Sequence, residues 1–211
     1  MPRRVLLALP LALALSGCTA SREVVAPPTA ERPNDGWRTL ATEDDRGRLR
    51  RWRAAWTEAL AKARAAGHGE AVAREGALLE PDAALAGARP PPGDYRCRTI
   101  KLGARSAGRA DFAAYPPLRC RVRSEGSRLH FSGLDGVQRP IGVLFPENGR
   151  RLVFLGTLQL GDEAMALRYS RDTERDMAGV VERVGEDRWR LVLPYPHFES
   201  LLDVIELVPS R

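Results

Sequence analysis

The fold is decided by a stretch in which apolar and charged residues alternate, Leu118-Arg119-Cys120-Arg121-Val122-Arg123. Side chains of a β-strand point alternately to its two faces, so this pattern predicts a strand with one apolar and one charged face. The same twofold pattern returns in residues 152–158 and 188–193. Hairpin turns are indicated between the patterned runs at Glu125-Gly126, Asp135-Gly136, Asn148-Gly149 and Gly185-Glu186.

Outward from this stretch, about eight or nine short strands are indicated between Asp94 and Val208, spaced as in an antiparallel sandwich or small barrel. Because nearly every connection reads as a hairpin, we favour a meandering barrel of about eight strands, which also leaves no exposed sheet edge. Within residues 95–102 the alternation changes phase, and a bulge near Arg98 would reconcile the two halves. Large interior residues at 131, 154 and 189 favour a filled core.

A helical segment is predicted before the barrel, over residues 42–89. Thr42 is its expected N-cap, and the three acidic residues that follow suit the positive end of the helix dipole. An apolar stripe for packing recurs at helical spacing up to Gly67, the expected C-terminal stop, and consists of Leu49, Trp52, Trp56, Leu60 and Ala63. A second helix is expected over 70–79, and a turn at 82–85 could start another.

Three consecutive prolines at residues 90–92 form the strongest break in the chain, since proline joins neither a helix interior nor a sheet ladder. The periodicity changes from helical to twofold after this point. The sequence therefore predicts an α+β fold, in which the helical segment packs on a barrel domain comprising residues 90–211.

The N-terminus predicts export. Arg3 and Arg4 precede an apolar run, Val5 to Leu15, that is shorter than the roughly 20 residues needed to cross a bilayer as a helix. This arrangement is typical of a signal peptide over residues 1–17. Residues 18–41, which contain Ala-Pro-Pro and no apolar periodicity, then predict a flexible tether.

The end of this segment, Leu15-Ser16-Gly17-Cys18, resembles the lipobox of bacterial lipoproteins. The resemblance implies cleavage before Cys18 and attachment of acyl chains to its thiol, and several chains on one residue hold a protein firmly to a membrane. Thr19 rather than Asp after the cysteine implies sorting to the outer membrane, facing the periplasm. The alternative is an ordinary signal peptide that happens to contain a cysteine.

The charge of the chain does not indicate a nucleic-acid partner. The formal net charge is +6 and the isoelectric point about 9.8, values that would normally suggest an anionic partner. However, lysine occurs only at Lys62 and Lys101. The arginines are scattered among acidic residues rather than clustered in a stripe, and an envelope protein does not meet nucleic acid.

Cys97 and Cys120 remain once Cys18 is assigned to lipid. An even pair in an oxidising compartment predicts a disulfide first, and both residues fall on inward-facing positions of consecutive predicted strands. In the chain-entropy picture the bridge stabilises by roughly 3 kcal/mol. Two free buried thiols, or a two-cysteine metal site without further ligands, are the alternatives.

No complete catalytic constellation or metal-ligand spacing is found, so we expect neither an enzyme nor a cofactor. Ser200, His197 and Asp203 lie within seven residues of one another, but nothing exposes the serine as a nucleophile, and Asp203 and Glu206 should face opposite sides of a strand. A recognition surface is sought first on the charged loop Arg171, Asp172, Arg175 and Asp176, and second on the aromatic residues Tyr195, His197 and Phe198.

Three stretches resemble a family of small proteobacterial envelope lipoproteins known as domain of unknown function 4893, namely residues 93–98, 156–163 and 188–200. The resemblance implies a shared fold and export, and no activity. The architecture is also similar to the lipocalin-like bacterial inhibitors of proteases and lysozymes, which is an analogy of fold alone.

These observations predict a non-catalytic binding module, anchored to the outer membrane by lipid, whose partner is an envelope protein. A carrier that holds a small amphiphile inside the barrel is the first alternative, because eight strands leave room for side chains or one small ligand. A hydrolase using His197 and Ser200 is the least favoured.

Overall fold

The computed structural model describes residues 35–210 of the chain. The strands of this region form one antiparallel sheet, which closes on itself because the first long strand pairs with the last. They are β1 (Gly93–Ala104), β2 (Phe112–Ala114), β3 (Leu118–Glu125), β4 (Arg128–Gly133), β5 (Gln138–Asn148), β6 (Arg151–Leu160), β7 (Asp176–Gly185), β8 (Arg188–Pro194) and β9 (Ser200–Pro209).

The barrel meanders as predicted, since each strand from β3 to β8 pairs with the next strand along the chain. The extra short strand β2 pairs with the second half of β1, whereas β3 pairs with the first half. Tyr115, Pro116 and Pro117 separate β2 from β3, and proline has no N–H to donate to a ladder. The α+β barrel is therefore confirmed, with an interrupted partner strand beside β1.

One end of the barrel interior is filled by aromatic side chains. The ring of Tyr95 meets that of Trp189 edge to face at 6.2 Å, and Phe131 meets Phe154 in the same way at 6.1 Å. Gly142 and Gly156 lie opposite each other, and a Cβ on either would come within 2.6 Å of the Phe154 ring. The predicted filling of the interior holds at this end, and the other end is hollow.

The expected bulge near Arg98 was wrong. The register between β1 and β9 is continuous from Tyr95 to Leu102. Tyr95 and Cys97 are buried inside the barrel, while Ile100 and Leu102 are buried on its outside, beneath the helices. The alternation changes phase because the first half of β1 carries its apolar residues on the face inside the barrel, whereas the second half carries them on the outer face.

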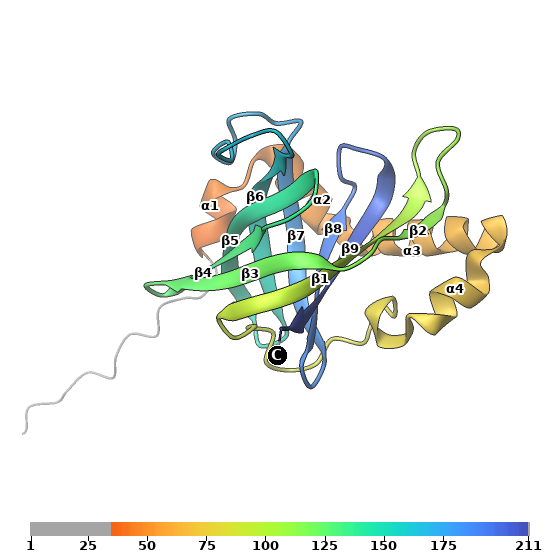
Figure 1. Ribbon diagram of the computed structural model, residues 1–211, viewed down its shortest axis with the longest axis horizontal. Helices are drawn as coiled ribbons and strands as arrows, with labels where there is room; N and C mark the ends of the chain where they lie inside the picture. The colour runs from red at the N-terminus through yellow and green to blue at the C-terminus, as the bar shows by residue number, and fades with distance from the viewer. Residues whose placement is uncertain (1–34, 211) are drawn as a thin grey trace, which may run out of the picture. The chain divides into compact units, whose positions relative to one another are not determined.

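Most of the helical segment packs on the outer wall formed by β1, β7, β8 and β9, whereas its first helix contacts β5; the helices do not cover an end of the barrel (Figure 1). They are α1 (Asp35–Leu40), α2 (Glu43–Arg50), α3 (Trp52–Ala63), the π-helical turn η1 (Arg64–His68), α4 (Gly69–Arg74) and the 3-10 turn η2 (Gly76–Leu78). None of the helices in residues 35–210 is both long and apolar enough to span a membrane.

Two of the predicted helix boundaries are confirmed. The Thr42 hydroxyl accepts a hydrogen bond from the Asp45 amide at 3.2 Å, as an N-cap does. Gly67 has a φ of 87°, the left-handed conformation expected of a helix stop. The single predicted helix is divided at Arg51 into α2 and α3, and no helix starts at residues 82–85, where Leu85 instead bridges to Arg183.

The tether predicted over residues 18–41 extends too far, because residues 35–40 form α1. The Trp37 side chain of this helix is buried, and its indole N–H donates to Glu147 Oε2 at 2.7 Å. An aromatic anchor of this kind fixes the segment to the barrel. The signal peptide, Cys18 and the remainder of the tether lie outside the described residues.

The predicted disulfide between Cys97 and Cys120 is present. It joins the neighbouring strands β1 and β3 inside the barrel, with the two Cα atoms 5.9 Å apart. The strands are adjacent in the sheet, although β2 lies between them in sequence. The bridge therefore joins β3 to β1 close to residues 115–117, where the strand that pairs with β1 is interrupted.

A buried ion pair fixes the helical segment to the outside of the wall. Arg190 of β8 is completely buried, and its guanidinium donates to Glu182 Oε2 of β7 at 2.6 Å and 2.9 Å. It also donates to four backbone carbonyls around η2, those of Ala77, Leu78, Glu80 and Pro81. Trp56 of α3 covers the guanidinium at 4.4 Å.

Candidate functional site

The hollow end of the barrel holds a cavity of about 260 Å³. We call this open end the mouth. The connections β6–β7 and β8–β9 lie at this end, opposite the C-terminus (Figure 1). Much of the wall is apolar and comes from the inner faces of the strands, with Leu118, Pro140, Leu158, Met177, Leu193 and Ile205 as its main contributors.

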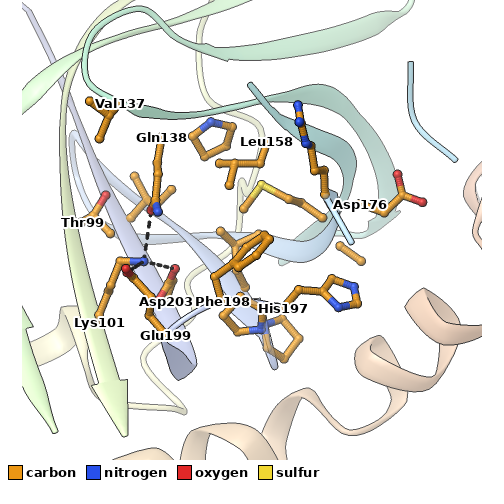
Figure 2. A pocket seen from close by; sticks show the side chains of 18 of the residues that line it. Thr99, Lys101, Val137, Gln138, Leu158, Asp176, His197, Phe198, Glu199 and Asp203 are labelled. Carbon is orange, nitrogen blue, oxygen red and sulfur yellow. Dashed lines mark hydrogen bonds and ion pairs between the residues drawn. The ribbon is translucent and has the colours of Figure 1, made fainter. Parts of the chain in front are cut away.

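A group of charged side chains lies against the apolar wall of the cavity. The Lys101 ammonium contacts Glu199 Oε2 at 2.9 Å, Asp203 Oδ2 at 3.4 Å and Gln138 Oε1 at 3.3 Å. Figure 2 shows these contacts as dashed lines, with Lys101 at their centre. We call these four residues the Lys101 cluster. It comes from β1, β5, β9 and the connection before β9, and it forms one polar part of the cavity, to which Arg48 and Asp176 add a second.

The cluster changes the titration of its members. Burial raises the pKa of Asp203, although the charge of Lys101 and a hydrogen bond from Ser200 Oγ act in the opposite direction. Burial alone would lower the pKa of Lys101, but Asp203 and Glu199 outweigh it and the pKa is raised. The hydrogen bond from Lys101 lowers the pKa of Glu199. The lysine therefore stays charged in a largely apolar surrounding.

Residues 195–199, which we call the mouth loop, connect β8 to β9 beside the cavity. Phe198 lies over the cavity with 43% of its surface exposed, and Figure 2 shows its ring among the lining side chains. Tyr195 and Glu199, at the two ends of the loop, have φ angles of 46° and 68°. These left-handed values are unfavourable for residues other than glycine.

The two regions proposed from the sequence meet at this mouth. Arg175 and Asp176 line the cavity from the β6–β7 side, and His197 and Phe198 line it from the mouth loop. His197 Nδ1 lies 3.8 Å from Glu174 Oε2, across the two connections. Three of the proposed residues do not line the cavity: Arg171, Asp172 and Tyr195. The Tyr195 hydroxyl is directed to Glu58 of α3, to which it donates at 3.1 Å.

Sequence reasoning missed Lys101, Gln138 and Glu199, and it considered Asp203 only as a member of an incomplete catalytic triad and of a failed carboxylate pair. Asp203 and Glu206 do point to opposite faces, and Glu206 bonds Arg98 outside the barrel. A signal for Lys101 was present, however. It lies in phase with the inward-facing Tyr95 and Cys97, just as Asp203 lies in phase with Ile205. Opposite charges on inward positions of two strands would have indicated a polar group inside the barrel.

The arrangement does not resemble a hydrolytic centre. Ser200 is buried and its hydroxyl donates to Asp203, whereas His197 lies 3.8 Å from the carboxylates of Asp44 and Glu174. A serine nucleophile needs a histidine base within hydrogen-bond reach. Within residues 35–210, no group of three or more His, Cys, Asp or Glu side chains could hold a metal ion.

Fold and cavity together define a small closed barrel with a cavity of about 260 Å³ at its mouth. The chain matches the family described as Domain of unknown function (DUF4893) over residues 37–207. It therefore belongs to this family, whose match includes the helices and all strands of the barrel. No curated protein and no solved structure matches the chain.

Proposed function

We propose that this protein is a non-catalytic binding module that takes a small amphiphilic molecule into the mouth of its barrel. The observation that carries the proposal is the cavity of about 260 Å³, whose apolar wall carries the half-buried Lys101 cluster and, in addition, the buried side chains of Arg48 and Asp176. Ligand sites are typically concave, mostly apolar and equipped with few polar groups. A volume just below the usual range of about 300–1,000 Å³ fits a short ligand.

The rim of the mouth supports the proposal. Large apolar side chains are exposed around the cavity, and those that line it are Tyr115, Leu118, Val137 and Phe198. Exposed apolar groups that gather in one place mark sites of binding, whereas scattered ones need no explanation. The apolar part of an amphiphile would cover these side chains and the wall below them.

A cavity-filling substitution tests this function. Met177→Trp places an indole in the cavity, and Met165→Trp is the matched control, because Met165 is 81% exposed and does not line the cavity. Native mass spectrometry of protein purified from its producing cells should detect a bound small molecule in the wild type and in Met165→Trp only. A ligand retained equally by Met177→Trp would place binding elsewhere, and a wild type that never binds any amphiphile would refute the function.

The exposed rim also favours a second function, recognition of an envelope protein whose apolar side chain enters the mouth. The charged residues Arg175 and Glu174 beside the rim would then contact the partner. Crosslinking from a photoreactive residue at position 137 in intact cells tests this function. A specific adduct that disappears in Phe198→Ala would support it, and labelling of lipid only would contradict it.

The location is part of the proposal. The lipobox-like sequence ending at Cys18 supports anchoring of the domain to the outer membrane, where nucleic acid is not a partner. Metabolic labelling with palmitate followed by fractionation should find the label in the outer membrane, and Cys18→Ser should abolish it. Recovery of the unprocessed chain from the cytosol would overturn the location and leave the cavity unaffected.

A further inference from the structure

The way in which Lys101 is neutralised indicates what kind of ligand the cavity takes, and this inference rests on the proposed function. Asp203 is a fixed partner: it lies on β9, its side chain is 9% exposed, and it also accepts a hydrogen bond from Ser200. Glu199 is a less constrained partner. Its side chain is 25% exposed and it belongs to the mouth loop rather than to a strand. Lys101 therefore has one permanent and one replaceable carboxylate.

We propose that the cavity binds a short amphiphile with a carboxylate head, and that this carboxylate replaces Glu199 on the Lys101 ammonium. The exchange removes one carboxylate and supplies another, so the charge around Lys101 is the same before and after. The alkyl part would lie along Leu158, Met177 and Ile205. Burial of this apolar surface favours binding, while the ion pair fixes the orientation of the head.

The displaced Glu199 does not lose its compensation. Its other oxygen, Oε1, contacts the Arg109 guanidinium at 3.1 Å, and the Arg109 side chain is 57% exposed. Glu199 can therefore move outward with Arg109 into solvent when Lys101 is taken by the ligand. A displaced carboxylate left buried without a cation would be costly.

The mouth loop is suited to this movement. Tyr195 and Glu199 hold left-handed backbone conformations, and the Lys101 contact holds the Glu199 end against the barrel. Because the Glu199 carbonyl also accepts a hydrogen bond from the Arg105 amide at 3.0 Å, the backbone stays in place and the exchange is a rotation of the Glu199 side chain out of the cavity. At the other end, the Pro196 carbonyl accepts from the Arg105 guanidinium at 2.9 Å and Tyr195 bonds Glu58, so the loop is anchored at both ends while the Glu199 side chain moves.

Other head groups fit less well. An ammonium head in the place of Glu199 would lie against the Lys101 ammonium and leave it with one carboxylate fewer; the other buried carboxylate of the wall, Asp176, belongs to β7 and not to the Lys101 cluster. Two cations in one apolar site repel each other strongly. A hydroxyl head does not neutralise Lys101 and cannot replace Glu199, so it leaves the closed arrangement in place.

Calorimetric titration of the full chain with octanoate, octylammonium and octanol tests the inference. Glu199→Gln keeps the shape of the side chain and removes the competing charge, so octanoate should bind about 3- to 10-fold more tightly. Lys101→Met should weaken octanoate about 10- to 100-fold. The matched control is Lys62→Met, which removes the only other lysine, outside the cavity on α3, and should leave the affinity unchanged.

The outcomes separate the two proposals. Tight binding of octanol or octylammonium, with octanoate indifferent to both Glu199→Gln and Lys101→Met, would keep the cavity as a binding site and overturn the carboxylate exchange. Absence of binding by all three probes would overturn the binding function itself. If Lys101→Met does not fold, Glu199→Gln still decides, because an unchanged octanoate affinity in that variant contradicts the exchange.

Discussion

Two cations lie on opposite faces of the same barrel wall and are held in different ways, Arg190 fully buried and Lys101 with 13% of its side chain exposed. Arg190 points outward from β8, where Glu182, four backbone carbonyls and the Trp56 ring surround it. Lys101 points inward from β1, where all three of its contacts are side chains. The partners of Arg190 belong to strands and to tightly packed turns, whereas one partner of Lys101 belongs to a loop at an open mouth.

The difference shows how a structural ion pair is distinguished from an exchangeable one. Backbone carbonyls cannot leave a cation without unfolding the segment that carries them, so the Arg190 contacts form and break with the fold. A loop carboxylate can leave by a local movement. The type and origin of the partners, rather than burial alone, therefore indicate where a ligand can enter.

The largest effect is expected from Arg190→Met. The substitution leaves four carbonyls and one oxygen of Glu182 without their donor, while Arg151 still pairs with the other oxygen at 2.6 Å. We expect a loss of about 3 to 5 kcal/mol in the free energy of unfolding, measured by urea denaturation. Arg123→Met, at an exposed position of β3, should change it by less than about 0.5 kcal/mol. If Arg190→Met lowered the free energy of unfolding by no more than Arg123→Met does, the distinction between Arg190 and Lys101 would be contradicted.

Removal of the disulfide should have the next largest effect. The double variant Cys97→Ala, Cys120→Ala loses a bridge between residues 23 positions apart, for which we expect about 3 kcal/mol of destabilisation in chemical denaturation. Octanoate affinity should stay within about twofold of the wild type, because neither cysteine lines the cavity. A large loss of affinity would show that the mouth depends on the bridge.

A smaller effect that depends on pH is expected from Lys101→Met. The pKa of Asp203 is raised in the folded state, so the folded chain keeps a proton that the unfolded chain loses, and stability falls as pH rises above about 4. Without the lysine this pKa rises further and the fall becomes steeper. Urea denaturation should show a deficit of about 2 kcal/mol at pH 8 and a smaller one at pH 5. When Lys101→Met is added to Asp203→Asn, the deficit measured relative to Asp203→Asn alone should not depend on pH over this range.

The smallest effect on stability is expected from Glu199→Gln. Its ion pairs involve a loop residue that is one quarter exposed and an arginine that is more than half exposed, and such pairs contribute less than about 1 kcal/mol. Thermal unfolding should therefore be nearly that of the wild type, although ligand affinity rises. A destabilisation as large as that of Arg190→Met would show that Glu199 belongs to the structural framework.

Much of the barrel could be predicted from the sequence, because alternation and turn residues act locally. The run at Leu118–Arg123, the hairpin turns and the Thr42 cap all appear where these rules place them. The segment at Asp35–Leu40 could not be predicted as a helix, since its position depends on the packing of Trp37 against a distant strand. Contacts between residues far apart in sequence decide such segments.

The candidate site was predicted in part for the same reason. Loop composition drew attention to Arg175 and His197, which do line the mouth. The Lys101 cluster depends on the closing of the barrel, which brings β1 beside β9 and places β5 across the interior. No local sequence pattern indicates that these three strands come together. Only the phase of Lys101 and Asp203 along their strands hinted at it.

The pairing between β1 and β9 has a consequence for how the protein folds during its synthesis. Tyr95 pairs with Pro209 and Ala104 with Ser200, so the wall is completed by β9, the last strand of the barrel to be synthesised. Before β9 has been synthesised, the barrel cannot close and β1 lacks this partner, and pairing between strands so far apart in sequence is slow. A chain that lacks β9 because translation stopped early would therefore form an open sheet with unpaired edges, which is prone to aggregate, and not a smaller barrel.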